Sequence, residues 1–151
     1  MRRGIARAVL IAMMLAGSAA AASADEASVN AAIDADLGDH ALYQTTISAF
    51  QDAVANRNKQ DVAAFVRYPI VVTINGHKRT IRSSAAFVAA YDQIMTPDIV
   101  DAVTKQQYGD LFVNDQGIMF GNGEVWIHGL CLDRGCRHFV PKVVTIQHTG
   151  S

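Results

Sequence analysis

The chain has 151 residues, half of them hydrophobic, and a formal net charge of −1 at pH 7. This length is enough to bury a single hydrophobic core. The charge is near neutral and shows no strong basic excess, so we expect no nucleic-acid partner.

The first 24 residues have the features of a secretory signal peptide. Three arginines precede a short apolar run at residues 8–16, and small residues then lead to Ala24. A basic start, an apolar run and an A-x-A site together predict cleavage after Ala24. The apolar run is shorter than the ~20 residues that a membrane-spanning helix needs. We therefore expect a periplasmic or secreted protein with no membrane contact after cleavage.

The expected mature chain, residues 25–151, forms one domain. It holds all 14 acidic residues and 10 of the 13 Lys and Arg, so its formal charge is 10 − 14 = −4. In an oxidising compartment, Cys131 and Cys136 are expected to form a disulfide. The spacing matches neither a C-x-x-C redox motif nor a zinc site, so the disulfide is interpreted as structural.

The first part of the mature chain predicts helices. Residues 25–38 form either a frayed tail or a short helix. A helix is predicted to start at Thr45 or Thr46 and to end at residues 56–58, because its apolar residues follow helical spacing. A second, shorter helix is expected to follow, with Asp61 as its cap.

A β-hairpin and a third helix come next. Residues 70–74 are apolar and β-branched, which predicts a strand. Residues 75–76 are Asn-Gly, a favoured tight turn, and residues 78–82 are predicted to return as a second strand. Ser83 or Ser84 is expected to cap the third helix.

The remaining elements predict a further helix and antiparallel strands. Residues 96–98, Thr-Pro-Asp, are typical of a helix start, and that helix is expected to end near Tyr108. Residues 111–113 and 137–148 are predicted strands, with Pro141 at a bulge or an edge position. The order indicates an α+β fold, in which a curved antiparallel sheet carries N-terminal helices on its concave face.

Residues 117–129 predict a second hairpin between these strands. Asn122 and Gly123 are a favoured pair for a two-residue type I′ turn. Side chains alternate along a strand. One face is then apolar, with Ile118, Phe120, Val125 and Ile127, and the other carries Met119, Glu124, Trp126 and His128.

This layout resembles the nuclear-transport-factor-two-like, or SnoaL-like, superfamily of cystatin-like α+β cones. The similarity rests on FVRYPIVV at residues 65–72, FVAAYDQI at residues 87–94 and GIMFGNGEVWI at residues 117–127. The resemblance implies a cone-shaped fold and a homodimer through the sheet. The superfamily includes isomerases, cyclases and dehydratases beside non-catalytic binding modules, so the fold does not choose a function. The carboxylate and tyrosine of ketosteroid isomerase match no position here, and no catalytic residue is assigned.

Five side chains are candidate ligand-binding residues: Tyr68, Met119, Glu124, Trp126 and His128. Polar groups around an aromatic floor are typical of a small-ligand pocket. In the alternative interpretation, this face meets solvent or a partner subunit, and Tyr68 packs in the core. Glu124 and His128, four positions apart on one strand, lie ~13 Å apart and cannot share a metal or a hydrogen bond.

Other polar residues have weaker interpretations. A basic group in the first hairpin either receives an acidic partner or protects an edge strand; its members are His77, Lys78, Arg79 and Arg82. Asp92 is expected to face solvent. His138 and His148 lack the clustering of a metal site, and no nucleotide-binding or hydrolase motif is present. We therefore expect neither a metal nor a cofactor.

The function expected from these patterns is that of an exported, non-catalytic binding domain. It would hold a small ligand or a protein partner in a cone-shaped pocket between the helices and the sheet, lined by Trp126 and Glu124. One alternative is an acid–base enzyme of the isomerase or dehydratase type, in which Glu124 or His128 transfers the proton and Tyr68 assists. Another is an inhibitor or immunity-type protein that binds through the sheet face or the basic hairpin.

Overall fold

The computed structural model describes residues 18–149, so most of the predicted signal peptide lies outside the described residues. The helices are α1 (Ser18–Asp36), α2 (His40–Ala55), α3 (Lys59–Phe65), α4 (Ser84–Ala89), α5 (Tyr91–Ile94), α6 (Pro97–Thr104) and the 3₁₀ helix η1 (Tyr108–Asp110). The strands are β1 (Ile70–Ile74), β2 (His77–Ile81), β3 (Phe112–Asn114), β4 (Gly117–Phe120), β5 (Val125–Cys131) and β6 (Phe139–Ile146). The predicted α+β class with antiparallel strands is confirmed.

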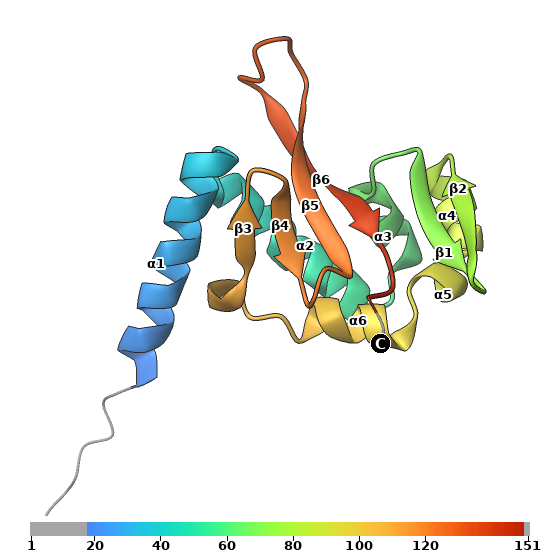
Figure 1. Cartoon of the computed structure of the whole chain (residues 1–151), viewed down its shortest axis with the longest axis horizontal. Helices are drawn as coiled ribbons and strands as arrows, with labels where there is room; N and C mark the ends of the chain where they lie inside the picture. Colours follow the sequence, from blue (N-terminus) through green and yellow to red (C-terminus); the bar gives the residue numbers. More distant parts are fainter. Residues whose placement is uncertain (1–17, 150–151) are drawn as a thin grey trace, which may run out of the picture.

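The strands form two sheets that lie side by side. One has the order β3-β4-β5-β6 and the other is the β1–β2 hairpin, and every strand pair is antiparallel. A parallel bridge between Val66 and Val143 joins the chain that enters β1 to β6. The Arg67 N–H also donates to the Val143 carbonyl oxygen at 2.9 Å. The last strand therefore has β5 on one side and the entry to β1 on the other (Figure 1).

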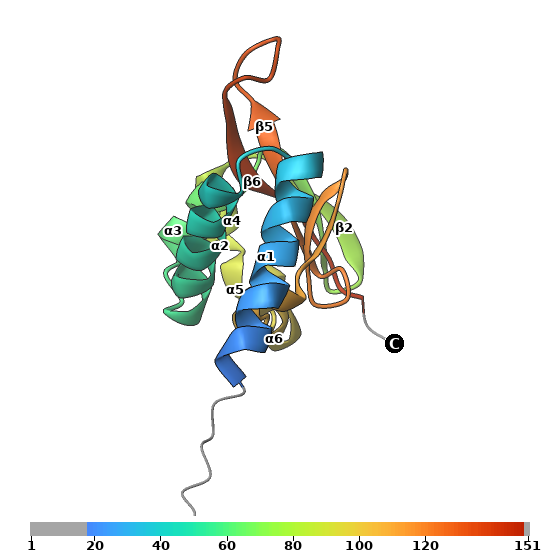
Figure 2. The same ribbon diagram turned by 90° about the vertical axis from the view of Figure 1, so that its left-hand side faces the viewer.

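The core lies between the four-stranded sheet and the helices. Figure 2 shows α2 and α3 on one side of this sheet. Phe120 of β4 and Phe50 of α2 are both fully buried, and their rings meet edge-on with centroids 6.0 Å apart. Ile118, Val125 and Ile127 are also fully buried. The alternation predicted for the hairpin is confirmed, and its apolar face is the one that packs against the helices.

A β-bulge in β6 keeps this face continuous. Val143 pairs with Ile127 and Ile146 pairs with Val125, and all four are buried. Val143 and Ile146 are three positions apart, so regular alternation would place them on opposite faces. A register shift puts one extra residue on β6 between them, which returns Ile146 to the core. Pro141 is not at the bulge but lies where β6 is paired with β5 alone, an edge position as predicted.

The start of α2 differs from the prediction. The helix begins at His40, upstream of the predicted Thr45 or Thr46, because the Asp39 side chain accepts the Ala41 N–H at 2.9 Å and caps it. The additional turn carries Tyr43, which is fully buried. Starting the helix at the later threonines would leave this core residue outside it.

Other helix limits are partly as predicted. Asn58, not Asp61, caps α3, and its side chain accepts the Asp61 N–H at 3.3 Å. Ser83 caps α4 as expected, accepting the Ala86 N–H at 3.2 Å. The third predicted helix is divided at Ala90 into α4 and α5. The next helix, α6, ends before the predicted limit, and η1 follows it as a separate turn.

The N-terminal segment is a helix and not a tail. α1 packs against β3 and η1, with Val29 and Ile33 buried. The Tyr108 hydroxyl donates to Asn30 Oδ1 at 2.6 Å and fixes the helix to η1. These contacts all lie after the predicted cleavage site at Ala24, so the mature chain would keep them. No helix in residues 18–149 combines the length and apolarity needed to cross a membrane.

The two hairpin turns differ in type. Asn75 and Gly76 have φ of 51° and 77°, as a tight Asn-Gly turn requires. In the second hairpin the positive φ values are at Gly121 (60°) and Gly123 (110°), and Asn122 is not in this region. The predicted type I′ turn is therefore wrong there. The predicted strand register is nevertheless confirmed, because Phe120 pairs with Val125 across the loop as predicted.

Candidate functional site

Three apolar side chains form a row across the outer face of the sheet. Met119 of β4 pairs with Phe112 of β3 on one side and with Trp126 of β5 on the other. The Phe112 ring is 52% exposed and meets the indole edge-on, with centroids 6.5 Å apart. Trp126 is partly exposed between the fully buried Val125 and Ile127, so its indole points away from the helices. We call Phe112, Met119 and Trp126 the outer row.

His128 and Lys142 lie beside the outer row, paired across β5 and β6. His128 Nδ1 is 2.8 Å from the Gly129 carbonyl oxygen. Because a carbonyl oxygen only accepts, this contact indicates that Nδ1 carries the proton and that Nε2 is an acceptor in the neutral ring. Lys142 Nζ donates to the Ala64 carbonyl oxygen at 2.6 Å and leans toward α3.

Glu124 ends the hairpin loop and has its own partners. Its carboxylate accepts the Asn122 N–H at 2.6 Å and the Thr149 hydroxyl. Partial burial acts to raise the pKa of Glu124, but the hydrogen bonds from Thr149 and from the loop backbone outweigh it and lower the pKa. The carboxylate is thus ionised at neutral pH and ties the loop to the C-terminal segment.

Tyr68 lies on the helix side. Its hydroxyl donates to the Ala63 carbonyl oxygen at 2.8 Å, and its ring meets Phe87 edge-on with centroids 6.3 Å apart. Burial raises its pKa to about 12, against a smaller opposing effect of a hydrogen bond with Ser84. Its hydroxyl is satisfied nearby and its ring packs against the core.

The five predicted ligand-binding residues are thus divided among three places. Met119, Trp126 and His128 share the outer face of the sheet, Glu124 lies at the hairpin loop, and Tyr68 lies on the helix side. The structure does not bring Tyr68 to the other four. The helix side of the hairpin, where the pocket was expected, is filled by fully buried side chains.

The hollows of the described surface include four of about 390–420 Å³, and Trp126 lines none of these four. One lies between α2 and α3, and one lies between α6 and the hairpin loop that carries Glu124. A third adjoins Arg57 and Tyr91, and the fourth lies beside β2 next to Arg79. The outer row lies outside these four hollows.

The other predicted residues are at the surface. His77, Lys78 and Arg79 are exposed on β2, and Arg82 is exposed just after it. Asp92 faces solvent as predicted and pairs with Lys59 at 2.7 Å. Residues 18–149 contain no group of three or more His, Cys, Asp or Glu side chains that could hold a metal ion.

The sequence interpretation missed Phe112 as a member of the site. Its neighbour Leu111 is buried, and Phe112 alternates outward. Extending the period of two from the hairpin to the preceding strand would have placed Phe112 beside Trp126. The sequence interpretation did not predict that β3 pairs with β4, and this pairing brings Phe112 to the site.

The predicted disulfide is confirmed, between Cys131 and Cys136, with Cα atoms 4.7 Å apart. It closes the far end of the β5–β6 hairpin, which extends beyond the rest of the molecule (Figures 1 and 2). We call residues 131–138 the stapled tip.

Comparisons with protein families, with curated proteins and with solved structures find no match to the chain.

Proposed function

We propose that the mature chain is an exported, non-catalytic domain that binds a protein partner through the outer row. The supporting observation is the contact between a half-exposed Phe112 and Trp126, with Met119 in line between their strands. Scattered exposed apolar residues are ordinary, whereas adjoining ones form a patch that marks an interaction site. Aromatic residues and Met are enriched at the centres of protein interfaces.

The position of the outer row outside the four hollows described above favours a protein over a small molecule. Small-ligand sites are concave, with volumes of roughly 300–1,000 Å³. Trp126 lines none of the four hollows of similar size on the described surface. A patch that spans three strands instead offers a broad contact to another protein surface.

Export is proposed from the N-terminal pattern together with the disulfide. Disulfides persist in oxidising compartments such as the periplasm and are rare in the cytosol. The bond between Cys131 and Cys136 is compatible with that destination. Membership of the SnoaL-like superfamily is part of the same proposal, and its non-catalytic members would supply the precedent for a binding role.

A binding role is also favoured by the state of the polar residues near the outer row. Glu124 is held by hydrogen bonds that lower its pKa, which is the opposite of the raised value expected for a proton-transferring acid. Tyr68, the proposed assistant of an acid–base enzyme, lies on the other side of the sheet.

Site-specific crosslinking tests the proposal. The full chain, with residues 1–24 retained for export and a photoreactive benzoylphenylalanine at Met119, would be expressed and irradiated in the producing cell, and the adduct identified by mass spectrometry. The recovered protein would then be purified and titrated while the emission of Trp126, the only tryptophan, is followed. We expect a shift in emission on binding.

Alanine variants separate the outer row from other exposed apolar residues. Phe112→Ala should weaken binding about 30-fold, which corresponds to the ~2 kcal/mol of an interface hot spot. The matched control is Val71→Ala, because Val71 is 57% exposed but lies on the other sheet. This variant should bind the partner with unchanged affinity. Equal affinities for the two variants, or no adduct at Met119, would reject the proposal. An adduct of twice the chain mass would reject a separate partner protein and show that the outer row binds a second copy of this chain.

A further inference from the structure

We infer that the stapled tip is a rigid probe that inserts into an apolar pocket with an acidic rim on a partner protein. This inference does not depend on the outer row. It rests on the shape of the tip, on its internal hydrogen bonds and on the side chains that it turns outward.

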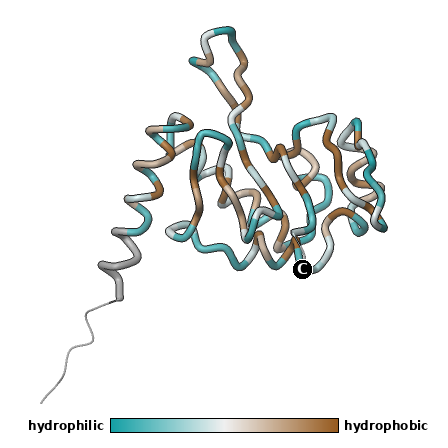
Figure 3. Tube along the Cα trace, viewed as in Figure 1, coloured by the Kyte–Doolittle hydropathy of each residue, from teal (hydrophilic) through white to brown (hydrophobic). Residues whose placement is uncertain are grey.

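The stapled tip projects from the body of the described chain. It is the far end of the β5–β6 hairpin, which extends beyond the other strands and the helices around it (Figures 1 and 2). Leu132 there is 68% exposed, the highest value among the large hydrophobic side chains described. Most of the far end is hydrophilic (Figure 3), so this leucine stands out against polar neighbours.

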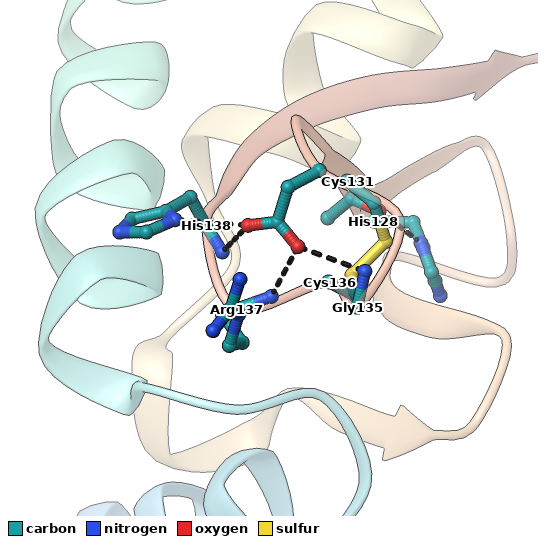
Figure 4. Close-up of a disulfide and its surroundings, with 8 residues drawn as sticks. His128, Cys131, Gly135, Cys136, Arg137 and His138 are labelled. Atoms are coloured by element: carbon teal, nitrogen blue, oxygen red, sulfur yellow. Dashed lines mark hydrogen bonds and ion pairs between the residues drawn. A yellow bond between two sulfur atoms is a disulfide. The ribbon is translucent and has the colours of Figure 1, made fainter.

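A disulfide and one carboxylate hold the tip in a single shape. Asp133 Oδ1 accepts the N–H groups of Gly135 at 2.9 Å and Arg137 at 3.2 Å. Asp133 Oδ2 accepts the His138 N–H at 2.9 Å and pairs with His138 Nδ1 at 2.8 Å. Figure 4 shows these bonds beside the disulfide. A loop that is already ordered loses little conformational entropy on binding, which favours affinity and a partner of matching shape.

The tip exposes two cationic side chains. The single carboxylate of the tip is fully engaged inside the loop, whereas Arg134 and Arg137 are exposed. Neither arginine has an ion-pair partner within the described residues. Guanidinium groups bind carboxylates in a two-pronged geometry, so the rim of the complementary pocket should be acidic.

The charge of the remaining domain would direct such a partner to the tip. Residues 25–151 carry a formal charge of −4, while the tip has two arginines against one aspartate. An acidic partner is repelled by most of the domain and attracted at the tip, which orients the encounter. The same side chains could meet an anionic lipid surface, but a fixed loop shape gives no advantage on a fluid bilayer. A protein is therefore the occupant that the geometry favours.

The test uses the full chain, expressed with residues 1–24 for export and carrying benzoylphenylalanine at Leu132, irradiated in the producing cell. We expect one dominant protein adduct, with the crosslink mapped to an apolar segment flanked by Asp or Glu. The double variant Arg134→Glu, Arg137→Glu should reduce its yield at least tenfold. The matched control Lys78→Glu, Arg79→Glu makes the same charge change on β2 and should keep the yield.

Charge exchange then decides whether the contact is direct. Exchanging the mapped acidic residues of the partner for lysine should restore the adduct with the Arg134→Glu, Arg137→Glu variant. Circular dichroism and a retained disulfide would show that this variant is folded. The inference is overturned if no adduct forms, if the reversed tip crosslinks as well as the native one, or if exchange restores nothing. Leu132-dependent binding to phosphatidylglycerol vesicles, with no protein adduct, would overturn it in favour of a membrane.

Discussion

Replacing both cysteines by serine tests how the stapled tip contributes to stability. The disulfide joins residues five positions apart, so six residues form the closed loop. By the chain-entropy relation, closing such a loop lowers the conformational entropy of the unfolded chain by roughly 7 cal/mol/K. At 25 °C this is about 2 kcal/mol of folding free energy that Cys131→Ser, Cys136→Ser should remove.

The full loss is expected only if the native tip stays ordered without the disulfide. Asp133 accepts three backbone N–H groups of the loop, and these bonds do not depend on the sulfur atoms. The variant should therefore keep the native loop and regain the entropy only when it unfolds. For a domain of this size, 2 kcal/mol corresponds to a fall in Tm of roughly 8 °C.

Urea unfolding, followed by circular dichroism and by Trp126 emission, measures this loss. The urea midpoint should fall while the slope of free energy against urea stays the same. Dithiothreitol should lower the native chain to the same midpoint and leave the serine variant unchanged. A loss below ~0.5 kcal/mol would refute the reasoning, because a native tip that becomes disordered gains the same entropy as the unfolded chain. Faster hydrogen exchange at the Gly135 and His138 amides would identify that cause.

Three further substitutions test the fold. Phe120→Ala should cost about 3–5 kcal/mol in urea unfolding, because the ring is fully buried against Phe50; a loss near 1 kcal/mol would contradict this packing. Gly117→Ala should destabilise by more than about 1 kcal/mol, since φ is 134° and a Cβ would collide with the Ile127 carbonyl oxygen; an unchanged midpoint would mean that β4 starts differently. The pKa of Tyr68 is raised from 10.0 to about 12, so between these pH values the Tyr68 hydroxyl ionises in the unfolded chain before it does in the folded one, and folding stability falls as pH rises. Absorbance titration at 295 nm, compared with the Tyr68→Phe variant, should show this late ionisation. Ionisation of Tyr68 near pH 10 in the folded chain would contradict it.

Features set by neighbouring residues could be predicted from the sequence. The hairpin register and the division of its side chains into two faces follow from the alternation around Phe120 and Val125, which is a local signal. The cap at Ser83 and the disulfide are local in the same sense. The start of α2 was missed because Asp39 and the later threonines are all acceptable caps, and burial of a tyrosine decides between them.

The position of the candidate site depended on non-local pairing. Alternation divides Trp126 from Ile127 but does not say which face the helices cover. Tyr68 was grouped with Trp126 because it precedes a strand and its hydroxyl was expected to point into the cone, yet the two lie on opposite sides of the sheet. The parallel bridge between Val66 and Val143 has no local signature in either segment, and it determines how the two sheets adjoin.

The place of β6 in the sheet has a consequence for how the chain is made and moved. At Val143 the last strand lies between β5 and the entry to β1, so the two sheets adjoin only after residues 139–146 are present. A nascent chain lacking this strand cannot assemble its centre, and such distant pairings form late. Under the export proposed above, a precursor could not complete its native fold until its C-terminal strand had been made, and such a delay would favour passage through a narrow channel.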